Sequence, residues 1–126
     1  MNIEVPISLG ELVDKITILQ IKRLEITNEN KLKNINYEYQ LLDNVLVETN
    51  IKDELKPLSD ELMSINRKIW DLEDVRRKCE NDKDFGEIFL DAVRQIHINN
   101  EERSRVKRII NTTYGSDIVE EKSYTE

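Results

Sequence analysis

The sequence has few of the residues that break or cross-link a chain: three glycines, two prolines and one cysteine among 126 residues. With so few turn-forming residues, a fold of many short strands is disfavoured and long helices are favoured. The single cysteine, Cys79, has no partner for an intrachain disulfide. This is typical of a protein in a reducing compartment.

Long apolar runs and net positive charge are also missing. No apolar stretch approaches the roughly 20 residues that cross a bilayer, and the N-terminus shows no signal-peptide pattern. The formal net charge is -7 at pH 7, with a sequence pI of about 4.9. Such a surface is a poor match for nucleic acid or for an anionic membrane. The composition therefore predicts a soluble cytoplasmic protein that binds neither nucleic acid nor a membrane.

The chain does have strong hydrophobic periodicity, beginning near its N-terminus. Ser8 with Glu11 three residues later has the spacing of a capping box, so a helix is predicted over residues 8–26. Apolar residues lie on nearly all sides of this helix and leave a narrow polar strip with Glu11, Lys15 and Lys22. We expect such a helix at the centre of the fold, packed against several neighbours.

The apolar register breaks after residue 26, which predicts a turn and a second helix over residues 30–47. A single kinked helix over residues 8–47 is the alternative, because no glycine or proline enforces the break.

Two helices of matched length complete the pattern, over residues 53–81 and 85–113. The first of them carries a heptad seam of six apolar residues, spaced three and four alternately: Leu55, Leu58, Leu62, Ile65, Ile69 and Leu72. Each helix would be about 43 Å long, which predicts an antiparallel hairpin, and residues 116–126 form a polar tail. The predicted fold is all-α: one domain over residues 1–126, an antiparallel bundle of three to four helices with a long C-terminal helical hairpin.

Polar residues interrupt the seam of this hairpin. Folding it about a turn between Asp82 and Lys83 places Asn66 opposite Asn99, with Arg103 one turn away. The first hypothesis is a hydrogen-bonded network that fixes the helix register. Arg103→Met should then change stability little, provided that the two asparagines satisfy each other. The second hypothesis is an anion pocket in which Arg103 supplies the charge.

Acidic motifs give little support for a metal site. Asp71, Glu73 and Asp74 in the string IWDLED have a spacing that suits a hard cation, but the arginines that follow predict ordinary helix-surface pairs. Glu11 and Asp14 form an E-x-x-D pair that resembles the magnesium motifs of all-helical nucleoside triphosphate pyrophosphatases. The E-E-x-x-E element that those enzymes need upstream is missing. We therefore predict no metal and no cofactor, and the sequence identifies no catalytic residue.

Four stretches carry a resemblance that covers nearly the whole chain: EVPISLGELVDKITILQIK, IWDLED, NNEERSRVKRIIN and GSDIVEEKSY. In these stretches the chain resembles a small bacterial family of uncharacterised helical proteins, a domain of unknown function. The resemblance implies a stand-alone helical domain and brings no catalytic residues. Because the string EEKSY belongs to the pattern, the resemblance also implies that the tail docks on the body of the protein.

Two function classes are consistent with these observations. The first is a cytoplasmic helical assembly or protein-interaction module. We expect it to be a homodimer, because helix pairs of unequal length leave apolar seam uncovered; another protein is the alternative partner. The second is a small all-helical enzyme or binding protein for an anionic metabolite. Its candidate ligand-binding residues are Lys15, Lys22, Asn66, Arg76, Asn99 and Arg103. Gathering of the cations in one enclosed pocket would favour the second class.

Overall fold

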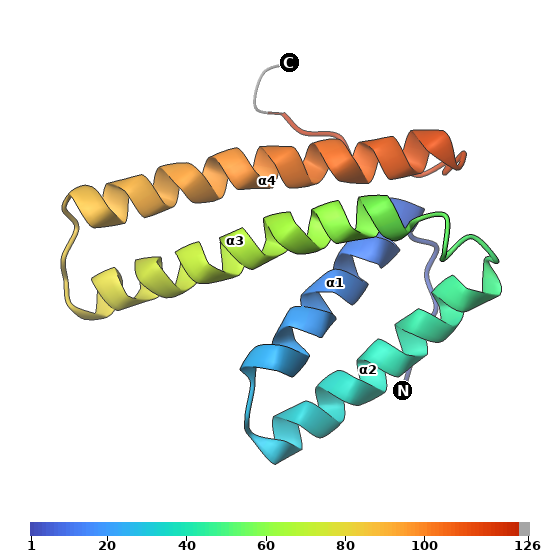
Figure 1. The fold of residues 1–126 in the computed structure, drawn as a ribbon, viewed down its shortest axis with the longest axis horizontal. Helices are drawn as coiled ribbons and strands as arrows, with labels where there is room; N and C mark the ends of the chain where they lie inside the picture. The colour runs from blue at the N-terminus through green and yellow to red at the C-terminus, as the bar shows by residue number, and fades with distance from the viewer. Residues whose placement is uncertain (124–126) are drawn as a thin grey trace.

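The computed structural model of the chain describes residues 1–123 and contains four α-helices (Figure 1). In chain order they are α1 (Leu9–Glu25), α2 (Glu29–Glu48), α3 (Lys56–Asn81) and α4 (Glu87–Thr113). Residues 1–123 contain no strand. The predicted all-α class is therefore confirmed, and α3 and α4 form the long C-terminal hairpin (Figure 1).

The segment that sequence reasoning left open forms two helices. α1 ends at Glu25, because Ile26 takes an extended backbone conformation with φ -88° and ψ 130°. A new N-terminal cap follows directly, in which the Asn28 side chain accepts a hydrogen bond of 3.0 Å from the backbone N–H of Lys31. The break thus depends on a side-chain cap and needs neither glycine nor proline.

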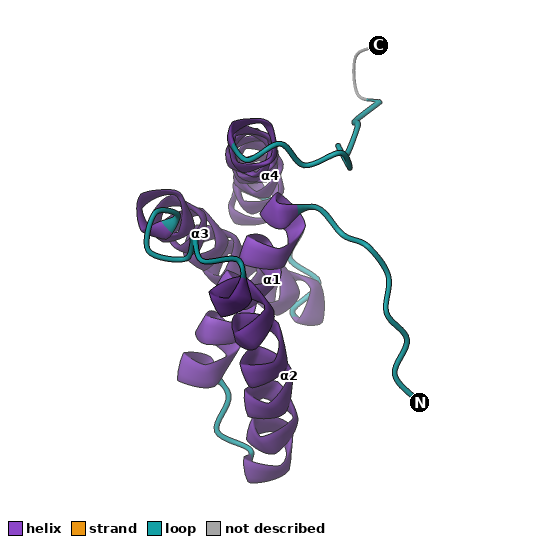
Figure 2. Ribbon diagram, turned by 90° about the vertical axis from the view of Figure 1, so that its right-hand side faces the viewer, coloured by secondary structure: helices purple, strands orange, loops and turns teal. Residues whose placement is uncertain are grey.

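α1 is the central helix of the bundle. It packs against each of the other three helices, whereas within residues 1–123 α2 has only α1 as a neighbouring helix (Figure 2). Eight of the 17 residues of α1 are buried, and they lie on several sides of the helix: Gly10, Leu12, Val13, Asp14, Ile16, Thr17, Leu19 and Ile21. The expectation of a centrally packed first helix is confirmed.

The hydrophobic core lies where α1 crosses the first half of α3 and the second half of α4. Its buried residues come from all four helices and from the residue before α3: Leu12, Val13, Ile16, Leu46, Leu55, Leu62, Ile65, Val106 and Ile110. Beyond this crossing, the end of α3 and the beginning of α4 extend past α1 and α2 (Figure 1). The hairpin is therefore covered at one end and bare at the other.

The first turn of α1 is held by the end of α4. The backbone N–H of Gly10 donates to Asn111 Oδ1 at 2.7 Å, and that of Leu9 donates to Ser116 Oγ at 3.1 Å. These bonds satisfy two of the four N–H groups that a helix leaves free at its start. A Cβ at position 10 would lie 2.6 Å from the carbonyl oxygen of Lys107. The close approach of the two helices therefore requires glycine here.

Candidate functional site

A buried carboxylate joins α1, α3 and α4 at the centre of the fold. Asp14 has no exposed surface. Its Oδ1 accepts hydrogen bonds of 2.9 Å from Asn66 Nδ2 and of 2.9 Å from Arg103 Nε, and its Oδ2 accepts a short bond from Arg103 Nη2. Asn66 Nδ2 also lies 2.9 Å from Thr17 Oγ1. These four residues are called the Asp14 cluster below.

The electrostatics of the Asp14 cluster favour charged side chains on both partners. Hydrogen bonds to Asp14 raise the pKa of Arg103 further above its ordinary value, although partial burial opposes the shift. The guanidinium binds both oxygens of the carboxylate, which is the strongest geometry for such a pair. The oxygens of Asp14 thus accept three hydrogen bonds inside the core, which offset part of the cost of burying this side chain.

A second layer of charges covers the Asp14 cluster on the side of the C-terminal tail. Lys107 Nζ lies 2.7 Å from Glu11 and 3.1 Å from Glu120, and 3.9 Å from Asp14. Burial alone would lower the pKa of Lys107, but the hydrogen bonds to Glu11 and Glu120, together with the negative charges of Asp14 and Glu11, raise this pKa overall. Hydrogen bonds from Lys122 and then from Lys107 lower the pKa of Glu120. Within the described residues, Glu120 and Glu121 of the tail therefore contact α4, while Tyr124 of the EEKSY string lies outside the described residues.

The structure brings together two of the six residues expected to bind a ligand, Asn66 and Arg103. Their meeting point was not expected, because Asn99 was predicted to face Asn66. Instead, Asn99 donates to the carbonyl oxygen of Gln95 at 2.8 Å within α4, while Asn66 turns toward α1 and binds Asp14. An ionised carboxylate is the stronger acceptor, which accounts for this choice of partner.

The other expected cations are dispersed. Lys15 pairs with Glu11 at 3.8 Å on the surface of α1, and Lys22 lies in the last turn of the same helix. Arg76 is on the outer half of α3, where its guanidinium binds Glu73 at 2.8 Å and Glu80 at 3.0 Å. Lys15 and Arg76 are therefore paired with carboxylates of their own helices, and the expected cations are not gathered around one pocket.

Sequence reasoning missed Asp14 as the residue on which the polar contacts converge. One signal was present: Gly10, Asp14, Thr17 and Ile21 are spaced four, three and four residues apart, so they share a helix face. On this face Ile21 is apolar and Gly10 lacks a side chain, and all four residues are buried. An aspartate on a buried face needs a cationic partner from another helix. Arg103, which interrupts the apolar pattern of the last helix, was the candidate for this partner.

A cleft of about 740 Å³ separates α1 and α2 from the beginning of α3. It is lined by three cations and three carboxylates among apolar residues: Arg23, Lys52, Lys56, Asp43, Asp53 and Asp60. Lys52 lies 2.8 Å from Asp43, and Lys56 lies 3.2 Å from Asp60. The cleft therefore has no surplus of positive charge for an anionic ligand.

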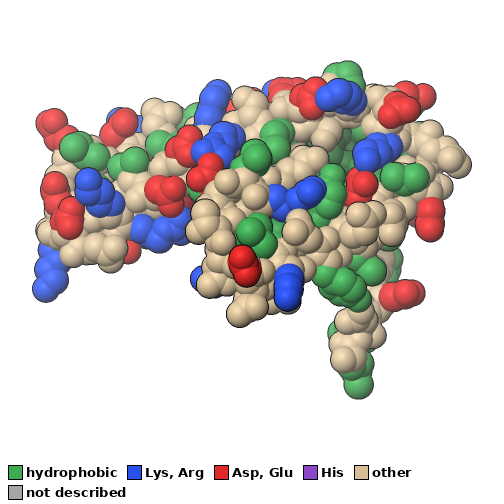
Figure 3. Space-filling view, turned by 60° about the horizontal axis from the view of Figure 1, so that its bottom comes forward, with side chains coloured by type: hydrophobic (Ala, Val, Ile, Leu, Met, Phe, Trp, Pro, Cys, Tyr) green, Lys and Arg blue, Asp and Glu red, His purple; other side chains and the backbone are tan. Residues whose placement is uncertain are grey.

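Apolar side chains are exposed over the bare end of the hairpin, scattered among charged ones (Figure 3). Six of them, here called the distal hairpin surface, are exposed by 39–65%: Val75, Phe85, Ile88, Leu90, Val93 and Ile98. A groove of about 300 Å³ runs between α3 and α4 and is lined by Leu72, Val75, Ile88 and Ala92, with Glu87 and Asp91 also in its lining. Leu90 and Val93, three residues apart, lie on another side of α4. The bare end thus presents apolar surface on two sides.

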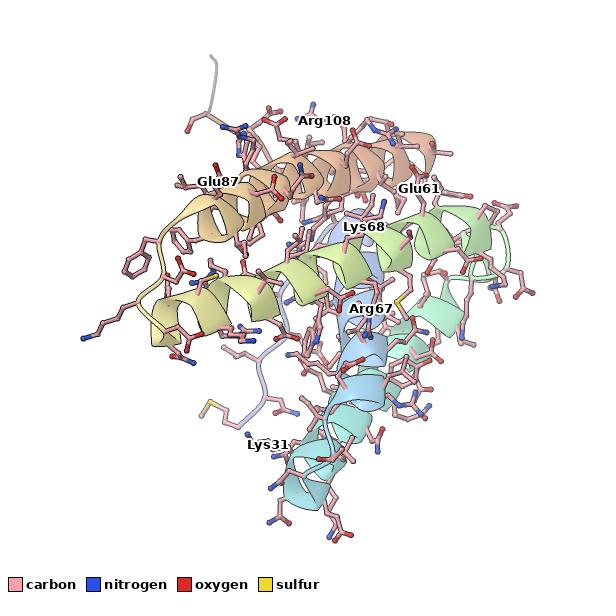
Figure 4. All side chains as sticks on the ribbon, turned by 60° about the vertical axis from the view of Figure 1, so that its left-hand side comes forward. Lys31, Glu61, Arg67, Lys68, Glu87 and Arg108 are labelled. Carbon is pink, nitrogen blue, oxygen red and sulfur yellow. The ribbon has the colours of Figure 1, made fainter. Side chains whose placement is uncertain are left out.

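The acidic residues of the IWDLED string, considered above as a metal site, are engaged in ion pairs. Arg67 of α3 lies over α1 (Figure 4) and pairs with Glu25 and with Asp71 of the IWDLED string. Asp74 pairs with Arg77. Among residues 1–123 there is no group of three histidine, cysteine or acidic side chains placed to hold a metal ion. Within the same residues, no helix has the length and hydropathy needed to cross a membrane.

Comparisons with known proteins identify one family and give no activity. The sequence model of a family of unknown function, DUF6165, matches residues 1–126. Neither a curated protein nor a solved structure matches the chain. The function must therefore be argued from the geometry.

Proposed function

The chain belongs to DUF6165, a family of unknown function, and we propose that it is a helical self-assembly module whose copies pack through the distal hairpin surface. One observation carries the proposal: Ile88 and Leu90, at the start of α4, are exposed by 65% and 60%. Exposed apolar surface concentrated on one part of a protein is typical of interaction sites, and six exposed apolar side chains lie on this end of the hairpin. The hairpin is long enough to offer them beyond the reach of α1 and α2.

The magnitudes favour a stable complex. Covering the exposed parts of all six apolar side chains contributes about 5–9 kcal/mol per copy, and a symmetric dimer gains two such sets when its interface covers both sides of the bare end. Association costs roughly 4–15 kcal/mol in lost translational and rotational freedom. The apolar surface of the bare end is thus large enough to offset that cost when both sets are covered.

Binding of an anionic metabolite, the alternative function, has less support. Arg103 is occupied by Asp14, and Arg76 lies far along α3 with carboxylates of its own. A hollow of about 350 Å³ beside Arg103 also contains Lys107 and Lys122, but Glu11 and Glu120 share its lining. These carboxylates already balance most of the positive charge that an anion would need.

We further propose that the module works in the cytoplasm. Cys79 is a free cysteine and only 8% exposed, and a buried free thiol suits a reducing compartment. Cell fractionation tests this location. Recovery of the protein mainly outside the cytoplasmic fraction would contradict it.

Sedimentation equilibrium at micromolar concentration tests the self-assembly. The parent chain should have about twice the mass of one copy, which is 14.9 kDa, whereas Ile88→Asp and Leu90→Asp should sediment as single copies. Leu41→Asp is the matched control, because Leu41 is a 46% exposed apolar residue on α2. A parent chain that stays monomeric at high concentration would refute the proposal. Loss of the dimer in Leu41→Asp alone would place the interface on α2.

A further inference from the structure

The N-terminal arm, residues 1–7, is an extended segment that leaves the body of the protein (Figure 2). Its apolar side chains alternate with polar or proline positions, as M-N-I-E-V-P-I. Met1, Ile3, Val5 and Ile7 are exposed by 115%, 83%, 68% and 41%. In an extended chain, alternate side chains point to the same side. The arm therefore has one apolar edge, with Asn2 and Glu4 on the other.

Such an edge has the form of a docking segment. Single exposed apolar residues are common on protein surfaces, but four at alternate positions of one extended segment present a continuous apolar edge. Extended segments are recognised by pockets that take alternate side chains. Figure 2 shows the arm leaving the body, and its apolar side chains are exposed, so this edge is open to a partner.

We propose that the arm of one copy docks in the groove between α3 and α4 of a second copy. The groove offers apolar lining from Leu72, Val75, Ile88 and Ala92. When the apolar edge faces this lining, Glu4 points to solvent, away from the carboxylates of Glu87 and Asp91. The inference rests on the proposed function, because it names the segment that covers part of the distal hairpin surface.

The reach of the arm requires a second copy. The root of the arm is fixed at the end of α4, where the N–H groups of Leu9 and Gly10 bind Ser116 and Asn111. From Asn111 back to Ala92, the groove residue nearest along α4, the helix rises about 29 Å. The nine residues from Gly10 back to Met1 span at most about 32 Å when fully extended, so no more than the first residue could reach the near edge of the groove. The arm therefore cannot lie along the groove of its own chain. In a dimer, each copy supplies one arm that docks and one groove that accepts the arm of the other copy.

The first experiment places the same added charge on either edge of the arm in the full chain. We expect Ile3→Asp to weaken dimerisation tenfold or more in sedimentation equilibrium, because it puts a carboxylate on the apolar edge. Asn2→Asp, which adds the same charge to the other edge, should change the dimerisation constant less than threefold. Equal effects of the two variants would overturn the inference, since they would reflect charge and not the docked edge.

Cross-linking identifies the groove. In a Cys79→Ala background, a copy carrying Ile3→Cys should form an intermolecular disulfide with a copy carrying Val75→Cys. It should not do so with a copy carrying Leu41→Cys. A parent dimer that Ile88→Asp disrupts but Ile3→Asp leaves intact would refute arm docking while the proposed function stands. A monomeric parent chain would refute both, so the two failures are distinguishable.

Discussion

A carboxylate without exposed surface remains ionised in a helical core only when several donors replace its water. Asp14 has three such bonds, from Asn66 Nδ2 and from two nitrogens of Arg103. Because they come from α3 and α4, the residue fixes how α1 lies across the hairpin. Specificity of packing, more than net stability, is what a buried ion pair of this kind contributes.

Removing one partner of this pair should be costly. Arg103→Met leaves Asp14 buried with Asn66 and the more distant Lys107, so we expect a loss of about 3–5 kcal/mol in the free energy of unfolding by urea. The sequence-based expectation of a small effect assumed that Asn66 and Asn99 satisfy each other, which they do not. Arg77→Met removes an exposed pair and should cost at most about 1 kcal/mol.

The double variant Asp14→Leu with Arg103→Met supplies the decisive comparison. It removes the buried charge together with its partner, so it should be more stable than Arg103→Met alone. If the double variant is the less stable of the two, the carboxylate is not the source of the cost. Packing of the arginine stem would then be its main contribution.

Gly10 tests the contact between α1 and α4. Alanine inside a helix is ordinarily more stable than glycine by about 0.5–1 kcal/mol. Here the added Cβ would lie 2.6 Å from a backbone carbonyl and 2.9 Å from Asn111 Oδ1, so Gly10→Ala should instead destabilise by about 1–3 kcal/mol. Thermal or urea unfolding measures this. At Gly86 the nearest atom is a side-chain oxygen at 3.2 Å, and a Gly86→Ala variant as unstable as Gly10→Ala would argue against the close approach.

At the scale of whole elements, periodicity predicts the helices well. The helix expected over residues 53–81 begins three residues later, at Lys56, because residues 52–55 form a turn whose last member, Leu55, is fully buried. Periodicity shows which side of each helix is apolar, and the all-α fold class was predicted from this pattern. It could not show the crossing of α1 over the hairpin, since that depends on the contacts of Asp14 and Gly10 with α4. From the sequence, Asp14 was considered only as part of an E-x-x-D pair, and no contact was predicted for Gly10.

The seam of α3 is buried unevenly, and the cost of truncation should follow. Leu62 has no exposed surface, whereas Ile69 is only partly buried because it lies toward the bare end. We expect Leu62→Ala to cost about 2–5 kcal/mol in urea unfolding and Ile69→Ala to cost less. A larger effect at Ile69 would indicate that a second copy covers that part of the seam under the conditions of the measurement.

At the scale of the whole molecule, α1 crosses the hairpin at one end and, among the described helices, α2 packs only against α1, so the other end of the hairpin is left bare (Figure 1). α1 and α2 have 17 and 20 residues, against 26 and 27 in α3 and α4. The difference of six to ten residues amounts to about 9–15 Å of helix. The sequence predicted this mismatch from helix lengths alone. The sequence also predicts an extended arm at the N-terminus, but it could not predict that the arm stays exposed, because a seven-residue segment with alternating apolar residues has no periodicity that places it on or off the body.

The charge of the molecule opposes the assembly that its apolar end favours, and this gives a prediction about salt. Each copy has a formal net charge of -7 at pH 7, so two copies repel one another at low ionic strength. Raising the salt concentration from about 0.01 M to about 0.1 M shortens the Debye length from about 30 Å to about 10 Å. Burial of apolar surface does not depend on attraction between charges. The dimerisation constant should therefore favour the dimer by a further two- to tenfold at the higher salt concentration, as measured by sedimentation equilibrium. Sodium chloride and potassium chloride at equal ionic strength should act alike, because the effect is one of screening.

A dimer that dissociates as salt is added would instead be held together by ion pairs, and the distal hairpin surface would not be its main contact.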